Sequence, residues 1–129
     1  MKRTDCPSRL AQWPCQIRLA PPNAPYFEDA DLLIAADCTA YAYATFHEQF
    51  MKDRITLIAC PRLDAQVVAE QLEAIFRNNS IGSVLVVGMD APCCGGLTTA
   101  VEKAVGTLEI EIPVQVVTLS TDGKIISKT

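Results

Sequence analysis

The fold class that the sequence predicts is a doubly wound α/β domain with three layers, and three observations predict it. The chain has 129 residues, of which 50% are hydrophobic, a size and composition typical of one domain with a substantial core. Continuous apolar runs occupy residues 32–36, 55–59, 83–87 and 114–119, as expected of strands covered on both faces. Helical patterns separate these runs, and that alternation favours a mostly parallel sheet of the Rossmann or flavodoxin type.

The N-terminal part is predicted to be less regular than the rest. We expect residues 1–12 to form an irregular arm and residues 13–129 to form the cysteine-rich α/β domain. Residues 15–20 predict one further strand. Three prolines between residues 21 and 25 remove backbone donors and restrict φ, so they indicate a loop.

Apolar periodicity predicts the helices between the strands. We expect a short helix over residues 41–51, a second over 64–78 and a third that begins near Gly95. Their apolar faces would be Tyr43, Phe46 and Phe50; Val68, Leu72, Ile75 and Phe76; and Leu97, Val101, Ala104 and Leu108. Near the C-terminus, Asp122-Gly123 indicates a hairpin turn, after which residues 124–127 would form an antiparallel edge strand.

Charge and hydropathy limit the partners and the compartment. The chain carries 11 basic and 15 acidic residues and has no basic cluster, so neither nucleic acid nor an anionic membrane is expected as a partner. No apolar run has the length of a membrane span, and Met1-Lys2-Arg3 is followed by no apolar signal region. We therefore expect a cytoplasmic protein, in which thiols stay reduced and clustered cysteines indicate metal binding or catalysis.

Four cysteines fall where predicted parallel strands end. Cys38 follows the run at 32–36, Cys60 follows the next run, and Cys93 and Cys94 follow the third. Because parallel strands point the same way, all four thiols should reach the carboxyl edge of the sheet, where α/β folds build their sites. Four thiolates suit an iron–sulfur cluster or tetrahedral zinc, and the spacing alone does not distinguish these metal centres.

The segment Cys93-Cys94-Gly95-Gly96 strengthens this interpretation. It lies where a strand is predicted to lead into a helix, so backbone N–H groups and the positive end of the helix dipole should face the thiolates. Both effects favour a thiolate over a thiol. Glycine at positions 95 and 96 would leave room for a cluster to approach the backbone.

Each candidate also has a structural interpretation. Cysteine is among the most often buried residue types, so any one of the four could be part of the core. Cys6 would be an exposed thiol in the arm, and Cys15 suits the core better than a ligand role. His47, the one histidine of the chain, could bind metal, carry a proton, donate to a cluster sulfur or be structural. Asp37 and Asp90 flank the same edge as caps or turn residues, or they tune its charge.

The sequence contains no glycine-rich nucleotide-binding motif and no recognisable Ser/His/Asp arrangement. An electron carrier is therefore a better interpretation than a catalyst.

Six segments carry a similarity to a known family: Trp13-Pro14-Cys15-Gln16, Pro21-Pro22-Asn23-Ala24-Pro25, Ala30-Asp31-Leu32-Leu33-Ile34-Ala35-Ala36-Asp37-Cys38, Phe46-His47, Cys60-Pro61-Arg62-Leu63-Asp64 and Pro92-Cys93-Cys94-Gly95-Gly96. As a set they resemble the C-terminal domain of ferredoxin-type iron–sulfur proteins, which bind [4Fe–4S] clusters in anaerobic bacteria. In that family the domain often follows a two-cluster ferredoxin module, whose Cys-x-x-Cys-x-x-Cys run is absent from this sequence.

The resemblance implies that Cys38, Cys60, Cys93 and Cys94 ligate a cluster. The chain departs from the family at Cys15, where an apolar residue is expected, and at Arg62, where lysine is usual. The Cys-Cys-Gly motif is also similar, more loosely, to the cysteine-rich domains of heterodisulfide reductase subunits.

Three hypotheses follow from the sequence. The first is an electron-transfer protein with a [4Fe–4S] or [2Fe–2S] cluster and a redox partner protein. The second is a structural zinc module that docks onto such a partner. The third is a thiol enzyme that uses Cys93 or Cys94 as the nucleophile, which the strain of a disulfide between adjacent cysteines disfavours. A homo-oligomer is compatible with all three.

Overall fold

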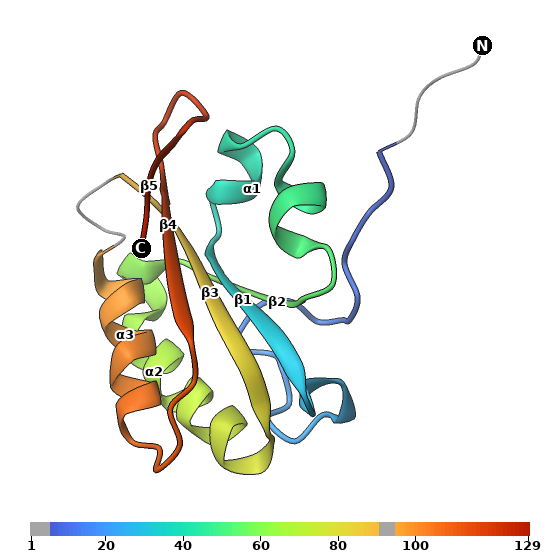
Figure 1. The fold of residues 1–129 in the computed structure, drawn as a ribbon, viewed down its shortest axis with the longest axis vertical. Coiled ribbons are helices and arrows are strands. Elements are labelled where there is room, and N and C mark those ends of the chain that lie inside the picture. The colour runs from blue at the N-terminus through green and yellow to red at the C-terminus, as the bar shows by residue number, and fades with distance from the viewer. Residues whose placement is uncertain (1–5, 91–94) are drawn as a thin grey trace.

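A five-stranded sheet forms the centre of the part of the chain that the computed structural model describes, residues 6–90 and 95–129 (Figure 1). The strand order is β2-β1-β3-β4-β5. The strands are β1 (Ala30–Ala36), β2 (Ile55–Ala59), β3 (Ile81–Met89), β4 (Val114–Leu119) and β5 (Ile125–Lys128). Strands β1 to β4 are parallel to one another, and β5 pairs antiparallel with β4.

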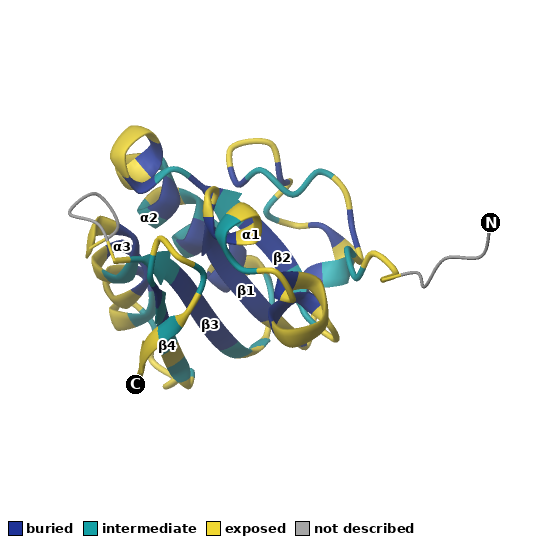
Figure 2. Ribbon diagram, turned by 90° about the horizontal axis from the view of Figure 1, so that it is seen from above, coloured by how far each residue is buried: buried dark blue, intermediate teal, exposed yellow. Residues whose placement is uncertain are grey.

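The four predicted parallel strands are confirmed. The runs at 55–59 and 114–119 coincide with β2 and β4, whereas β1 and β3 extend beyond the predicted runs. The predicted antiparallel edge strand is confirmed as β5, one residue further along the chain. Most of β1 is buried because it lies inside the sheet with a layer on each face (Figure 2).

Helices cover both faces of the sheet, so the doubly wound, three-layer prediction is confirmed. Helices α2 (Pro61–Asn78) and α3 (Gly95–Gly106) lie side by side on one face, against Leu32, Ile34 and Val86 (Figure 1). The short helix α1 (Thr39–Ala42) and the single π-helical turn η2 (His47–Met51) lie on the other face. The buried apolar residues of that layer are Phe46, Phe50 and Met51, which pack with Leu33, Ala35 and Val87.

The continuous helix predicted over residues 41–51 is wrong. The chain leaves helical geometry at Tyr43, whose φ and ψ are −109° and 115°, and then forms η2. Phe46 and Phe50 are nevertheless buried and in edge-to-face contact, with ring centroids 5.4 Å apart. The apolar spacing was therefore correct about burial, but two short helical segments achieve it instead of one helix.

The strand predicted over residues 15–20 is also wrong, although the segment does touch the sheet. Only Gln16 forms a bridge, parallel with Ile58 of β2. The backbone N–H of Ile17 donates to the Ile58 carbonyl at 3.0 Å, after which the N–H of Leu19 donates to the Gln16 carbonyl at 3.0 Å. That last bond closes a turn, so the segment leaves the edge of the sheet after one bridge.

Smaller differences concern the arm and α2. Residues 6–12, the described part of the predicted arm, form neither helix nor strand, and the predicted loop at residues 21–25 leads into a 3-10 turn, η1 (Pro25–Phe27). Helix α2 begins at Pro61, three residues before the predicted start. Proline is favoured at the first position of a helix because its missing N–H would have no intrahelical partner there.

The strand order determines where the fold can hold a ligand. The connection from β1 leads to β2 on one side, and the connection from β3 leads to β4 on the other. In open α/β sheets the crevice between two such strands, at their carboxyl ends, is the usual ligand site. In this protein those two strands are β1 and β3, which end at Ala36 and Met89.

Candidate metal centre

Cys38 and Cys60 lie at the same edge of the sheet. Strands β1 and β2 are in parallel register to their last residues, where Ala36 pairs with Ala59. The backbone N–H of Asp37 then donates to the Ala59 carbonyl at 2.9 Å. The two thiols therefore follow neighbouring strand ends, with Cys38 exposed and Cys60 half-buried.

Both cysteines occupy the position just before a helix. Cys38 precedes α1, and Cys60 precedes α2 in an extended conformation with φ −92° and ψ 113°. Neither side chain caps its helix. The thiols are thus not used for capping, although Cys38 Sγ donates to Oδ1 of Asp37 at 3.4 Å.

Cys93 and Cys94 lie outside the described residues, so their predicted ligand role stays a prediction. In sequence they stand between Met89, the last residue of β3, and Gly95, the first residue of α3. A Cβ atom built at Gly95 or Gly96 meets nothing within 4 Å. Packing against the described residues therefore does not require glycine at either position.

A network around Asp64 fixes the start of α2 beside Cys60. Asp64 is 5% exposed, and its Oδ2 accepts hydrogen bonds from the Cys60 backbone N–H at 2.8 Å and from Gln16 Nε2 at 3.3 Å. Its Oδ1 accepts a hydrogen bond from Nε of Arg18, and Nη2 of the same guanidinium donates to the Leu63 carbonyl at 3.0 Å. The N-terminal segment is thereby joined to Cys60, the residue that follows β2.

These contacts determine the ionisation of Asp64. Burial raises the pKa of its carboxyl, but the Cys60 N–H, the Arg18 guanidinium and the Gln16 amide lower it by more, so the pKa lies below its ordinary value. Asp64 is therefore ionised at neutral pH. This network was not predicted from the sequence, although an acidic residue in the first turn after Pro61 is a recognisable helix-start signal.

His47 forms its hydrogen bond with the N-terminal arm. Its Nδ1 accepts a hydrogen bond from the backbone N–H of Arg9 at 3.2 Å, and Arg9 also forms an ion pair with Glu48 at 2.8 Å. His47 lines a cavity together with Cys15 and Asp37. The structure thus brings His47 and Cys15 together, while Cys6 is exposed in the arm.

Within residues 6–90 and 95–129, no group of three or more His, Cys, Asp or Glu side chains could hold a metal ion. The donors predicted from the sequence are consistent with that result, because two of the four lie outside these ranges.

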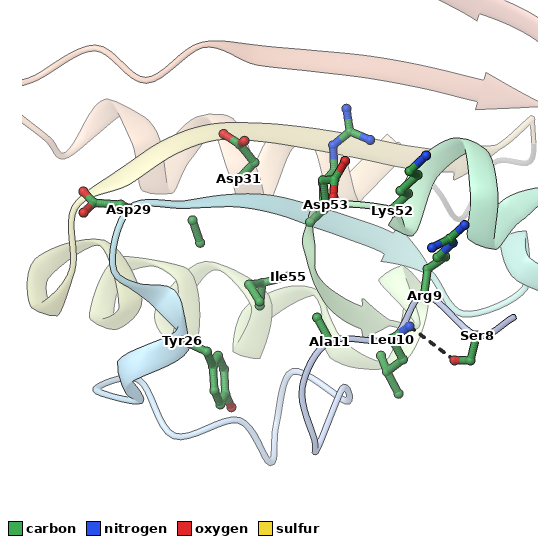
Figure 3. A pocket seen from close by; sticks show the side chains of 12 residues that line it. Ser8, Arg9, Leu10, Ala11, Tyr26, Asp29, Asp31, Lys52, Asp53 and Ile55 are labelled. Atoms are coloured by element: carbon green, nitrogen blue, oxygen red, sulfur yellow. Dashed lines mark hydrogen bonds between the residues drawn. The ribbon is translucent and has the colours of Figure 1, made fainter.

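A separate hollow of about 490 Å³ lies at the opposite edge of the sheet, where β1 and β2 begin (Figure 3). Its polar lining includes Arg9, Asp31 and Lys52, and its lining contains no cysteine among the described residues.

Sheet order, crossovers and layers define a Rossmann-like α/β protein. The model of a family described as "Rossmann-like domain" matches residues 24–129, and the chain therefore belongs to that family. It is also similar to an uncharacterized protein of Archaeoglobus fulgidus, with 34% identity over 96 residues that cover 74% of this chain and 67% of the relative. No solved structure matches the chain.

Of the helices in the described ranges, none combines the length and the apolar character needed to cross a bilayer.

Proposed function

We propose that this protein binds an iron–sulfur cluster through Cys38, Cys60, Cys93 and Cys94 and transfers electrons. The observation that carries the proposal is the position of Cys38 and Cys60 within two residues of the ends of two register-paired parallel strands. Cys93 and Cys94 follow the third strand of the same parallel set in sequence. The similarity of the cysteine segments to ferredoxin-type iron–sulfur proteins supports the same ligand set.

The donor set fits the proposed group chemically. Four cysteine thiolates are the usual ligands of [2Fe–2S] and [4Fe–4S] clusters, which supply reversible one-electron storage. Cys38 is exposed and Cys60 is half-buried, so solvent and a partner protein can reach this edge. We propose a redox partner protein that docks there, and the cytoplasm as the compartment in which these thiols stay reduced.

The residues around the thiols have definable roles in this proposal. Asp64 holds the backbone N–H of Cys60, so that N–H is not available to a sulfur atom. The proton of Cys38 Sγ lies against Asp37 Oδ1, and it must leave before the sulfur can bind metal. Asp37 therefore places a negative charge beside the proposed ligand and favours the oxidised state of a bound redox centre.

The test is metal and sulfide analysis of the full chain purified without oxygen, together with visible absorption and low-temperature EPR after reduction. We expect iron with matching labile sulfide and a reducible signal. Single serine substitutions at positions 38, 60, 93 and 94 should each reduce the iron content. Cys6→Ser is the matched control, because Cys6 is an exposed thiol of the arm, and it should retain the full iron content.

Other results would contradict the proposal in distinguishable ways. Zinc without sulfide or charge-transfer absorption would support a structural zinc module. Protein that stays metal-free after anaerobic reconstitution, with one cysteine alkylated stoichiometrically and turnover of a disulfide substrate, would support a thiol enzyme. Unchanged iron in all four serine variants would exclude these cysteines as ligands.

A further inference from the structure

Arg18 and Asp64 form a partly buried ion pair beside Cys60. Nε of Arg18 donates to Oδ1 of Asp64. The side chain of Asp64 is 7% exposed, whereas that of Arg18 is 47% exposed. The carboxylate therefore lies on the protein side of the pair, and the guanidinium lies on the solvent side.

The carboxylate of Asp64 holds the backbone of Cys60. Its Oδ2 accepts the Cys60 N–H at 2.8 Å, and the N–H of Asp64 donates to the Cys60 carbonyl at 2.7 Å. A hydrogen bond to an ionised carboxylate is about twice as strong as one between neutral groups. The charge of Asp64 therefore helps to fix the backbone from which the Cys60 thiol projects.

The same charge disfavours reduction of the proposed centre. Reduction adds an electron, so a carboxylate close to a ligand favours the oxidised state. Because Asp64 is buried, solvent and salt screen its charge less than that of an exposed carboxylate such as Asp37. A cation next to Asp64 offsets this effect, and Arg18 supplies that cation.

Helix α2 keeps Arg18 in this position. Nε2 of Gln71, on α2, donates to the carbonyl of Ile17 at 3.0 Å and to that of Ala20 at 2.9 Å. Nη2 of Arg18 donates to the Leu63 carbonyl, in the first turn of α2, at 3.0 Å. The helix therefore holds both the backbone around Arg18 and its guanidinium.

From the ion pair, the burial of its carboxylate and the hydrogen bond to Cys60, we propose that Asp64 and Arg18 are positioning residues of the proposed centre. Asp64 holds the backbone of Cys60, and Arg18 cancels the negative charge that Asp64 places beside the bound group. Both residues act through Cys60 and not as ligands. These roles rest on the proposed function, because they concern the same cluster.

The test is a potentiometric titration, followed by EPR, of the full chain loaded with its cluster in the absence of oxygen. Arg18→Gln leaves the Asp64 charge uncompensated and should lower the reduction potential, whereas Asp64→Asn leaves the Arg18 charge and should raise it. Each shift should change the ratio of reduced to oxidised protein at a fixed potential by about threefold to tenfold, on the order expected for one nearby charge. The double variant should lie close to the wild type.

A matched control separates charge from stability. Arg77→Gln removes an arginine that pairs with Glu73 near the other end of α2, and it should leave the potential unchanged. Loss of stability in Arg18→Gln and Asp64→Asn would act in the same direction in both variants. Opposite shifts that cancel in the double variant therefore report the charges and not the stability.

A second measurement needs no bound metal. In the metal-free chain, Asp64→Ala should accelerate hydrogen exchange of the Cys60 amide by about tenfold, as expected for the loss of one good hydrogen bond. Arg18→Gln keeps the carboxylate that holds this amide and should accelerate the exchange less.

The outcomes separate these roles from the proposed function. Absence of iron from the wild-type chain would overturn both. With the cluster present, shifts of the same sign in Arg18→Gln and Asp64→Asn, or no shift in either, would exclude charge compensation by Arg18. Equal exchange of the Cys60 amide in Asp64→Ala and the wild type would exclude Asp64 as the residue that positions Cys60.

Discussion

The backbone N–H of Cys60 donates to Oδ2 of Asp64 at 2.8 Å, and the N–H of Asp64 donates to the Cys60 carbonyl at 2.7 Å. These two hydrogen bonds join Cys60 and Asp64 in a closed ring at the start of α2. Because Arg18 donates to the same carboxylate, the ring also holds the N-terminal segment against the sheet edge. Both the N–H and the carbonyl of Cys60, a predicted metal ligand, are therefore held by Asp64.

Asp64→Asn should destabilise the protein at neutral pH. The variant loses charge-assisted hydrogen bonds to a buried carboxylate, which are worth about 1–3 kcal/mol in the free energy of unfolding. Urea denaturation at pH 7 measures this loss. Glu70→Gln, which changes an exposed carboxylate of the same helix, is the matched control and should be close to neutral.

The pH dependence of Asp64→Asn follows from the lowered pKa of Asp64. A carboxyl whose folded pKa is depressed contributes stability above its unfolded pKa of about 3.9 and loses it as pH falls through the folded pKa. The difference between wild type and Asp64→Asn should therefore be full at pH 7 and shrink below about pH 4. A difference that grows on acidification would contradict this account.

Asp37→Asn should raise the reduction potential of the proposed cluster. Reduction adds negative charge, and Asp37 places a carboxylate beside Cys38, so its removal favours the reduced state by tens of millivolts, on the order expected for a nearby charge. Potentiometric titration followed by EPR measures the shift. Asp31→Asn removes a carboxylate at the other end of the same strand, and a shift of equal size there would argue against a local effect.

Gln12→Leu should weaken the outer edge of β2. The Gln12 amide satisfies both backbone groups of Thr56, so its loss leaves two buried polar groups unpaired, at a cost of about 2 kcal/mol or more. Chemical denaturation should show the loss, and hydrogen exchange of the Thr56 amide should accelerate. Gln66→Leu, at an exposed position of α2, should leave both measurements nearly unchanged.

Gly123→Ala should destabilise the hairpin between β4 and β5. Gly123 has φ +87°, and a Cβ atom there would lie 2.7 Å from the backbone oxygen of Ala42. We expect a loss of about 1–3 kcal/mol, visible as a lower melting temperature. At Gly106, in contrast, a Cβ atom meets nothing within 4 Å, so Gly106→Ala should be neutral or stabilising by about 0.4–1 kcal/mol. Equal effects of the two alanines would contradict this reasoning.

Prediction from sequence failed at two segments, residues 41–51 and residues 15–20. Tyr43, Phe46 and Phe50 have helical spacing, yet the backbone breaks at Tyr43 because two short turns bury the same rings. Residues 15–20 have strand composition, but Gln16 Oε1 accepts the Arg18 N–H at 2.6 Å and the chain turns away. Local propensity does not reveal that a side chain such as that of Gln16 takes a backbone N–H that a strand would use for pairing.

The sequence by itself determined the sheet and the positions of the cysteines along it. Continuous apolar runs require cover on both faces, and that requirement specified four parallel strands, two long helices and the strand ends that Cys38 and Cys60 follow. The role of Cys93 and Cys94 stays a sequence prediction. Only the tertiary structure decided that Asp64 contacts Arg18 and that Gln12 contacts Thr56. The cavity that His47 lines is likewise a product of the tertiary structure. The partners in those two pairs are 46 and 44 residues apart, and no periodicity in a sequence encodes which distant polar groups must satisfy each other once the core has closed.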